Sequence, residues 1–319
     1  MDAPVHDAHR YQGLSHQAPA AAAGRDRADA DTHGAVVNAM SVDVEDYFQV
    51  SAFEHRIRRS EWDRFECRVP GNLARILDRF ERHGVRATFF TLGWVARRYP
   101  ECVRRIVAGG HELASHGYLH RRVTDLSPAR FRRDVRAAKA LLEDIAGQPV
   151  RGYRAPSYSI CAETLWALEV LEEEGFGYSS SVYPIRHDHY GMPEAPRHPF
   201  RPTPSGALLE VPVSTLRLAG CCLPCGGGGY FRLLPYGVSR WALGRVNRVE
   251  GRPTVFYFHP WEIDPDQPRQ PGLPWRTRFR HYLNLHRTED RLERLLGDFR
   301  WDRMDRVFLA RGPGGEGAA

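Results

Sequence analysis

Lysine, cysteine and long apolar runs are all scarce in this sequence of 319 residues. Among the 45 lysine and arginine residues only Lys139 is a lysine. This excess of arginine indicates a compositional bias in the coding sequence as much as the binding of a ligand. No window approaches the roughly 20 apolar residues of a membrane helix, and residues 1–35 contain no apolar core of a signal peptide. We therefore expect a cytoplasmic protein without a membrane span.

The six cysteines are spread along the chain, unlike the framework of a secreted disulfide-rich protein. Three of them, Cys221, Cys222 and Cys225, form a cluster followed by four glycines. A structural zinc needs four ligands, and no second cysteine pair or histidine pair lies nearby. We expect reduced thiols and a flexible loop at this cluster.

The overall balance of residue types is that of an ordinary globular protein. Hydrophobic residues make up 42% and charged residues 26%, and the net charge is +6. This excludes wholesale disorder and collagen-like repetition. Acids and apolar residues interrupt the basic tracts, and no basic stripe with interleaved aromatics is present, so we expect no nucleic-acid partner.

Apolar strands alternate with amphipathic helices after a polar leader. Residues 1–36 lack periodicity and predict a disordered leader. The alternation that follows predicts parallel strands with crossover helices, hence an α/β barrel or an open sheet. We expect one domain over residues 37–312, with a loop-rich insert at about 183–235 and a C-terminal helical extension at about 264–312. The expected strands are 36–44, 87–92, 112–115, 178–180, 254–259 and 307–309, and the expected helices are 70–84, 99–108, 127–147, 162–174 and 276–298.

Acidic residues follow the first expected strand. In an extended chain Asp43 and Glu45 point to one face, and Asp46 points to the other. Three acids this close repel one another, and a metal ion or another counter-charge would relieve the repulsion. A solvated turn or a helix N-cap also fits this segment.

Histidines and an arginine follow three later strands. The spacing of His116 and His120 places both rings on one helical face, which suits two ligands of a zinc-class metal. Two histidines and one carboxylate would leave positions open for water and substrate. Arg154 precedes a proline turn, where it can hold a carboxylate, and His259 ends an apolar strand. Taken alone, each also fits an ordinary structural role.

In this order, the motifs resemble the polysaccharide deacetylase family (carbohydrate esterase family 4) over residues 38–263. The resemblance implies a distorted (β/α) barrel with fewer than eight full units. It also implies a divalent metal, zinc foremost with Co, Ni, Mn or Fe as alternatives, and an N-acetylated sugar or glycan as substrate. The matching segments are Ser41 to Asp46, Ser115 to His120, Arg154-Ala155-Pro156, Ser179 to Ser181, and Phe258-His259.

The resemblance assigns roles to these residues, with one departure from the usual pattern. The family usually has two adjacent aspartates, whereas Val44 follows Asp43 here. We expect Asp43 to be the general base and Glu45 the carboxylate ligand, with Asp46 as the alternative ligand. Arg154 would orient Asp43, and His259 would protonate the leaving amine.

Aromatic residues near these motifs are candidates for sugar stacking, namely Tyr158, Tyr230 and Trp261. The segments Gly229 to Pro235, His259 to Glu262 and Arg280 to Leu285 resemble the subgroup associated with bacterial exopolysaccharide and exosortase loci. Two alternatives stay open. One is a hydrolase of a small amide or ureide, as in allantoinase-like relatives, and the other is an inactive glycan-binding relative. The sequence does not indicate an oligomeric state.

Overall fold

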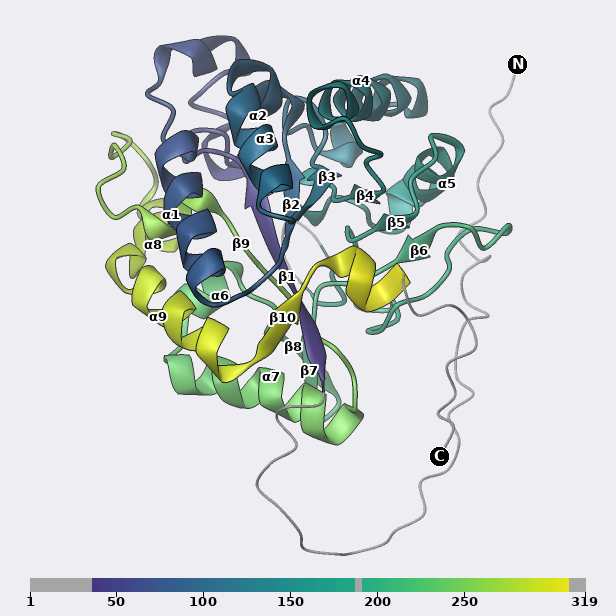
Figure 1. Cartoon of the computed structure of the whole chain (residues 1–319), viewed down its shortest axis with the longest axis vertical. Helices are drawn as coiled ribbons and strands as arrows, with labels where there is room; N and C mark the ends of the chain where they lie inside the picture. Colours follow the sequence, from purple (N-terminus) through teal and green to yellow (C-terminus); the bar gives the residue numbers. More distant parts are fainter. Residues whose placement is uncertain (1–35, 187–190, 310–319) are drawn as a thin grey trace, which may run out of the picture.

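The computed structural model describes residues 36–186 and 191–309. The expected leader, apart from residue 36, therefore lies outside the described residues, as do residues 310–312 of the expected domain. Eight strands form one parallel sheet, and two more form an antiparallel hairpin (Figure 1). In chain order the sheet strands are β1 (Val37–Val44), β2 (Thr88–Thr91), β3 (Glu112–Ser115), β4 (Gly152–Tyr153), β5 (Tyr178–Ser179), β6 (Leu209–Glu210), β9 (Val255–Phe258) and β10 (Arg300–Asp302), and the hairpin strands are β7 (Thr215–Leu218) and β8 (Cys221–Pro224).

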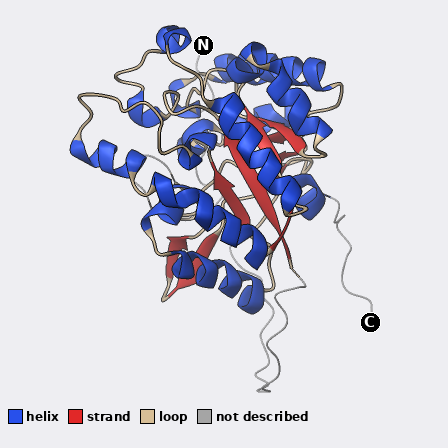
Figure 2. Ribbon diagram, turned by 60° about the vertical axis from the view of Figure 1, so that its left-hand side comes forward, coloured by secondary structure: helices blue, strands red, loops and turns tan. Residues whose placement is uncertain are grey.

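Strand β1 is the centre of the sheet because it pairs with three other strands. Its first half pairs with β10, its second half with β2, and β9 pairs along its middle. From β2 the sheet continues in order through β3, β4, β5 and β6. Within the described residues β6 and β9 are not paired with each other, so the curled sheet is an open barrel (Figure 2). The expected α/β barrel with fewer than eight full units is confirmed.

Helices cover the outside of the curled sheet (Figure 1). The first of them buries Leu73, Ile76, Leu77 and Phe80 at the spacing that predicted it. None of the described helices is both long and apolar enough to cross a membrane. The helices are α1 (Val69–Arg82), α2 (Gly93–Arg98), α3 (Pro100–Ala108), α4 (Pro128–Ala146), α5 (Trp166–Glu173), α6 (Gly228–Leu233), α7 (Tyr236–Glu250), α8 (Trp275–Tyr282) and α9 (Leu285–Asp298).

One hydrophobic core joins the early and late parts of the chain. Phe89 from β2 and Ile76 from α1 belong to the same buried cluster as Leu243 from α7 and Leu292 from α9. Trp301 of β10 completes this cluster. Removing the late segment would therefore expose apolar surface of the early one, at roughly 25 cal/mol per Å².

The C-terminal part differs from the sequence prediction in two places. The expected helix 276–298 is two helices, because Asn284 adopts a left-handed conformation with φ 53° that interrupts the helical path. The expected strand 307–309 is a π-helical turn at Asp305–Leu309, and the strand lies earlier, at β10. The periodicity also missed helix α7 and the β7–β8 hairpin.

A buried carboxyl group closes the amino end of the barrel. Glu112 accepts hydrogen bonds from the Thr88 hydroxyl, the Tyr178 hydroxyl (3.0 Å) and the backbone N–H of Asp305 (3.2 Å). Burial, together with the negative charge of Asp305, raises the pKa of Glu112 to about 7. The late segment is therefore fastened to β2, β3 and β5 through one titratable group.

We predict that this carboxyl group makes stability depend on pH. Its pKa is higher in the folded than in the unfolded chain, so its contribution is full below about pH 4.5 and is lost as the pH rises through about 7. The wild-type protein should lose about 1–3 kcal/mol of unfolding free energy, relative to Glu112→Gln, between pH 5 and pH 9. Urea unfolding of both proteins at each pH measures this difference. A constant difference across that range would contradict the prediction.

Candidate active site

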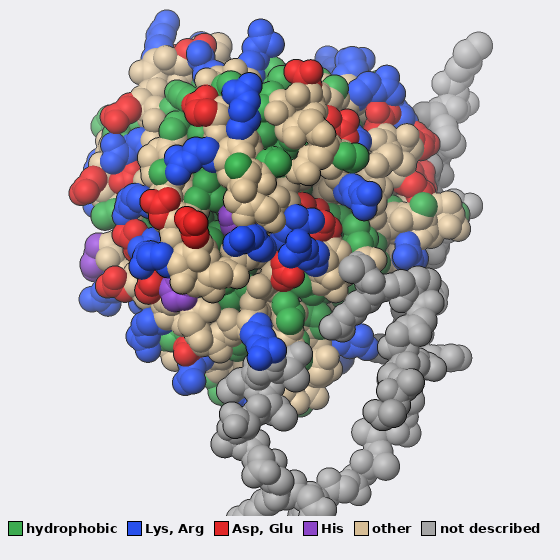
Figure 3. All heavy atoms as spheres, viewed as in Figure 1, with side chains coloured by type: hydrophobic (Ala, Val, Ile, Leu, Met, Phe, Trp, Pro, Cys, Tyr) green, Lys and Arg blue, Asp and Glu red, His purple; other side chains and the backbone are tan. Residues whose placement is uncertain are grey.

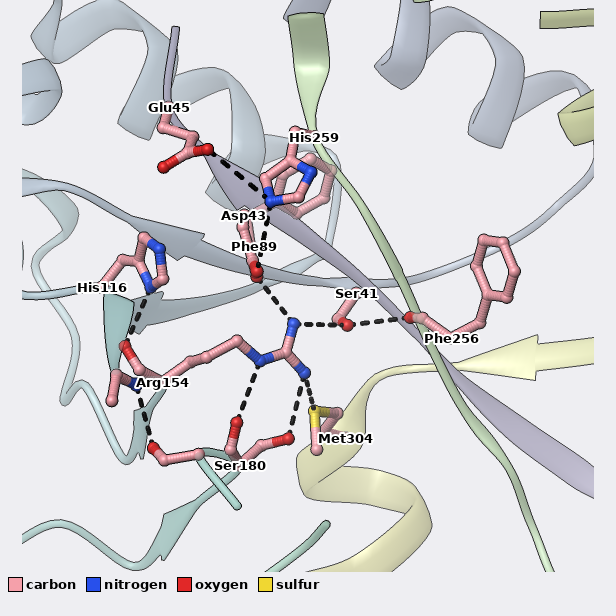
Figure 4. A network of polar contacts seen from close by, with 12 residues as sticks. Ser41, Asp43, Glu45, Phe89, His116, Arg154, Ser180, Phe256, His259 and Met304 are labelled. Carbon is pink, nitrogen blue, oxygen red and sulfur yellow. Dashed lines mark hydrogen bonds and ion pairs between the residues drawn. The ribbon is translucent and has the colours of Figure 1, made fainter. Parts of the chain in front are cut away.

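Polar side chains from four parallel strands meet at the carboxyl edge of the barrel (Figure 4). Asp43 and Glu45 lie at the end of β1, His116 follows β3, Arg154 follows β4, and His259 follows β9. Because parallel strands point the same way, residues far apart in sequence converge here. The structure thus brings together five of the residues that the sequence singled out.

Glu45, His116 and His120 offer ligand atoms that all lie within 4.8 Å of one another. All three side chains are buried. Nε2 of His120 lies 2.6 Å from Oε2 of Glu45, yet this buried oxygen makes no hydrogen bond of acceptable geometry. Nε2 of His120 and Oε2 of Glu45 thus converge without forming a hydrogen bond. Such convergence, in a set of two imidazoles and one carboxylate, fits a zinc-class divalent ion.

The ring of His116 is oriented by a backbone contact. Its Nδ1–H donates to the carbonyl oxygen of Arg154 at 2.8 Å, which leaves the lone pair on Nε2. Burial lowers the pKa of His116 to about 4, so the imidazole is neutral at pH 7. A hydrogen bond of this kind is the usual support of a metal-binding histidine.

The two histidines lie on a loop and not, as their spacing suggested, on a helix. Residues 116–120 have no helical assignment. Gly117 (φ 74°) and His120 (φ 50°) both adopt left-handed backbone conformations, which no continuous α-helix contains. The loop nevertheless brings the ring centroids within 5.3 Å of each other.

The structure does not bring Asp46 into this group. One of its oxygens accepts the backbone N–H groups of Arg68 (2.6 Å) and Val69 (3.0 Å), and the other accepts that of Tyr47 (2.8 Å). Burial raises the pKa of Asp46 to about 6. Its carboxylate is therefore turned toward the amino end of α1, where it stabilises unpaired N–H groups.

Arg154 is fully buried and holds Asp43. One guanidinium nitrogen donates to Oδ1 of Asp43 at 2.6 Å and to the Ser41 hydroxyl at 2.9 Å. The other two nitrogens donate to the carbonyl and the hydroxyl of Ser180 (Figure 4). The central carbon of the guanidinium lies 4.1 Å from the centroid of the Phe90 ring. These contacts fix one oxygen of Asp43 and leave Oδ2 directed toward His259, 3.9 Å from its Nε2.

His259 is paired with Glu262, three residues later in the chain. Its Nδ1 contacts Oε1 of Glu262 at 2.6 Å, and Arg232 donates to the other oxygen of Glu262 at 2.6 Å. Burial alone would lower the pKa of His259, but Glu262, Glu45 and Asp43 together raise it to about 9. The spacing of three residues between His259 and Glu262 is that of a capping box, and the backbone N–H of His259 also donates to Oε1 of Glu262 at 3.1 Å.

The aromatic candidates take different positions. Tyr158 and Trp261 are each 6% exposed, so neither presents an open face for sugar stacking. Trp261 stacks on the rings of His259 and His281, and its Nε1–H donates to Glu45 at 3.3 Å. Tyr230 is half-buried in α6. Burial thus argues against the expected stacking role for Tyr158 and Trp261, and makes Trp261 a residue that positions Glu45.

The fold and the site together define a parallel α/β barrel with a carboxylate and two histidines at its carboxyl edge. The family description "polysaccharide deacetylase" matches residues 62–175, and "domain of unknown function (DUF3473)" matches residues 180–309. Residues 62–175 therefore resemble the polysaccharide deacetylase family.

Individual relatives agree with this assignment. A peptidoglycan-N-acetylglucosamine deacetylase of Bacillus cereus is 33% identical over 96 residues, which are 30% of this chain and 35% of the relative. A chitooligosaccharide deacetylase of Sinorhizobium fredii is 41% identical over 101 residues, 30% of this chain and 42% of the relative. The chain thus spans well under half the length of these curated relatives.

A solved structure described as a polysaccharide deacetylase from Mycobacterium smegmatis has the same fold. Its TM-score with this chain is 0.54 at 19% identity, and the match covers 85% of this chain and 89% of the other. At this identity the likeness concerns the fold alone.

The geometry predicts opposite results for two neighbouring acids. Glu45→Ala should lower the metal content of purified protein from about one ion per chain to a small fraction, since it removes a ligand. Asp46→Ala should keep the metal and lose about 1–3 kcal/mol of unfolding free energy, because buried N–H groups of α1 lose their acceptor. Elemental analysis and urea unfolding measure the two effects. Metal loss in Asp46→Ala alone would reverse the assignment.

Proposed function

We propose that the protein is a metal-dependent hydrolase that removes N-acetyl groups from a sugar or polysaccharide, in exopolysaccharide biosynthesis. The observation that carries the proposal is the convergence of a three-ligand group with an arginine-bound aspartate and a carboxylate-bound histidine at one edge of the barrel. The deacetylase names of the relatives support the substrate class. They do not favour a small amide or ureide as substrate.

Glu45, His116 and His120 would hold the divalent ion, zinc foremost. When bound, the ion supplies Lewis acidity to the acetyl carbonyl. Asp43 takes a proton from the attacking water, and Arg154 holds this carboxylate in position through its contact with Oδ1. The oxygen of that water adds to the carbonyl carbon.

An amine is a poor leaving group unless it is protonated, and we assign this protonation to His259. Glu262 holds the imidazole by Nδ1, so Nε2 faces the space between Asp43 and Glu45. His259 donates a proton from Nε2 to the amide nitrogen as the carbon–nitrogen bond breaks. The products are acetate and a free amino sugar. An inactive protein would have no need to keep Arg154 paired with Asp43 and Glu262 paired with His259. The presence of both pairs argues against an inactive relative.

We expect acetate release from N-acetylated glycans by the metal-loaded protein. Asp43→Asn should retain the metal, because Asp43 lies outside the ligand group, and should lose at least about 10²-fold in kcat as a missing general base. Acetate assays on N-acetylglucosamine oligomers, with metal analysis of both proteins, measure this. Metal-loaded wild-type protein that releases no acetate from any N-acetylated glycan would contradict the proposed function.

The role of His259 predicts a difference between leaving groups. His259→Ala should lower kcat for amide substrates by about 10²–10⁴-fold. An aryl acetate ester, whose leaving group needs no proton, should lose much less. Glu262→Gln serves as the matched variant, since it keeps the ring but weakens its orientation, and it should show the same selective loss to a smaller degree. Equal losses on amide and ester would remove His259 from the role of general acid.

A further inference from the structure

An open surface cavity of about 370 Å³ lies beside the loop that carries His116 and His120. Its size falls in the range of small-ligand sites. No residue considered so far for metal binding or catalysis lines it. The lining includes Tyr118, Arg121, Leu126, Arg130, Arg133 and Asp134.

The cavity and the site share one wall. Tyr118 and Leu119 lie between the two histidines in sequence, and Asp134 of α4 accepts the backbone N–H of Tyr118 at 2.9 Å. Arg59 donates to the carbonyls of Leu119 (2.8 Å) and His120 (3.0 Å). Helix α4 begins soon after this loop, so its first turns lie at the same edge of the barrel as the site. Residues of the loop that carries His116 and His120 therefore also line the cavity.

The charge of the cavity is positive. Arg121, Arg130 and Arg133 are exposed, and none of them forms an ion pair within the described part of the chain. On the same helix Arg132 and Arg136 pair with Glu173 and Glu174. On α4, the arginines without an ion pair, Arg130 and Arg133, are therefore those that line the cavity.

Asp134 and the dipole of helix α4 determine how much positive charge remains in the cavity. The acid of the lining, Asp134, is mostly buried, turns one oxygen to Tyr118, and interacts electrostatically with Arg121 and Arg59. Arg130 lies in the first turn of α4, which contains no acid. The positive end of a helix dipole disfavours a cation there and favours an anion. A surplus of positive charge remains.

We propose that this cavity binds a carboxylate-bearing sugar of the substrate, so that the protein acts on an acidic N-acetylated glycan. The guanidinium groups of Arg130 and Arg133 match a carboxylate in charge and in fork geometry. Tyr118 and Leu126 give the sugar ring an apolar flank. The choice of a glycan as ligand rests on the proposed function, and the charge of the ligand rests on the cavity.

The test compares two oligosaccharides of equal length. One alternates N-acetylglucosamine with glucuronic acid, and the other contains N-acetylglucosamine alone. Binding to the metal-loaded protein is measured by calorimetry, and acetate release gives kcat/KM. Arg130→Gln/Arg133→Gln should weaken binding of the acidic oligosaccharide about tenfold or more and lower its kcat/KM similarly. Both values for the neutral oligosaccharide should stay within about twofold, and the metal content should not change.

A control variant changes the net charge equally elsewhere. Arg104→Gln/Arg217→Gln alters exposed arginines on α3 and β7, and should leave the preference for the acidic oligosaccharide intact. Equal loss in both double variants, or no loss in the cavity variant, would overturn the inference. Inorganic phosphate that competes as well as the acidic oligosaccharide at equal concentration would also overturn it, because the site would then be one for free anions. If cavity-dependent binding occurs without acetate release, the inference stands and the proposed function fails.

Discussion

The burial of Arg154 inside the barrel is the constraint on which the rest of the site depends. A guanidinium group cannot lose its protons under ordinary conditions, so its charge must be matched where it lies. Arg154 itself follows β4, and its partners come from two other strands: Ser41 and Asp43 of β1, and Ser180 after β5. The sulfur of Met304, from the end of the chain, contacts it at 3.8 Å. A shift in the register of any of these strands would leave a buried charge unpaired.

The late segment supplies the proposed proton donor of the site, His259. His259 and Glu262 follow β9, and Arg232 comes from α6, thirty residues earlier. Arg232 also donates to the carbonyl of His281, whose ring stacks on Trp261. One chain of contacts thus runs from α6 through Glu262 to the imidazole. The segment matched by the family of unknown function is therefore part of the site and not an appended unit.

Local patterns in the sequence predicted those parts of the structure that depend on neighbouring residues. The apolar run that predicted β1 and the spacing that predicted α1 both report on burial of one face, and both elements are present. The single helix expected over 276–298 failed at Asn284, because one left-handed residue leaves the apolar spacing on both sides unchanged. The prediction of a helix at His116 and His120 was also wrong. Spacing alone cannot distinguish a helix from a loop that is held by distant residues, here Arg59 and Asp134.

The residues of the site also differ in whether a local sequence pattern reveals them. Asp43, Arg154 and His259 were found because each ends a strand or begins a loop with a recognisable motif. Arg232 gave no such signal: it is one of many arginines, and only the folded chain brings it to Glu262. The ion pair is a contact between distant segments, and no local pattern encodes it. No sequence pattern distinguishes the unpaired arginines of the α4 cavity from Arg132 and Arg136, which form ion pairs.

The spacing of the two acids in β1 can now be understood from strand geometry. Val44 is fully buried and points into the core, so Asp43 and Glu45 lie on the other side of the strand together. The backbone N–H of Glu45 already bonds to the carbonyl of Asp43 at 3.0 Å, which shows that the chain turns immediately after the strand. After this turn the carboxylate of Glu45 lies 2.6 Å from Nε2 of His120, whereas that of Asp46 accepts backbone N–H groups at the start of α1. The acid that binds Arg154 and the acid that faces His120 are thus separated by one residue for a geometric reason, and both lie near Nε2 of His259, at 3.9 and 3.6 Å.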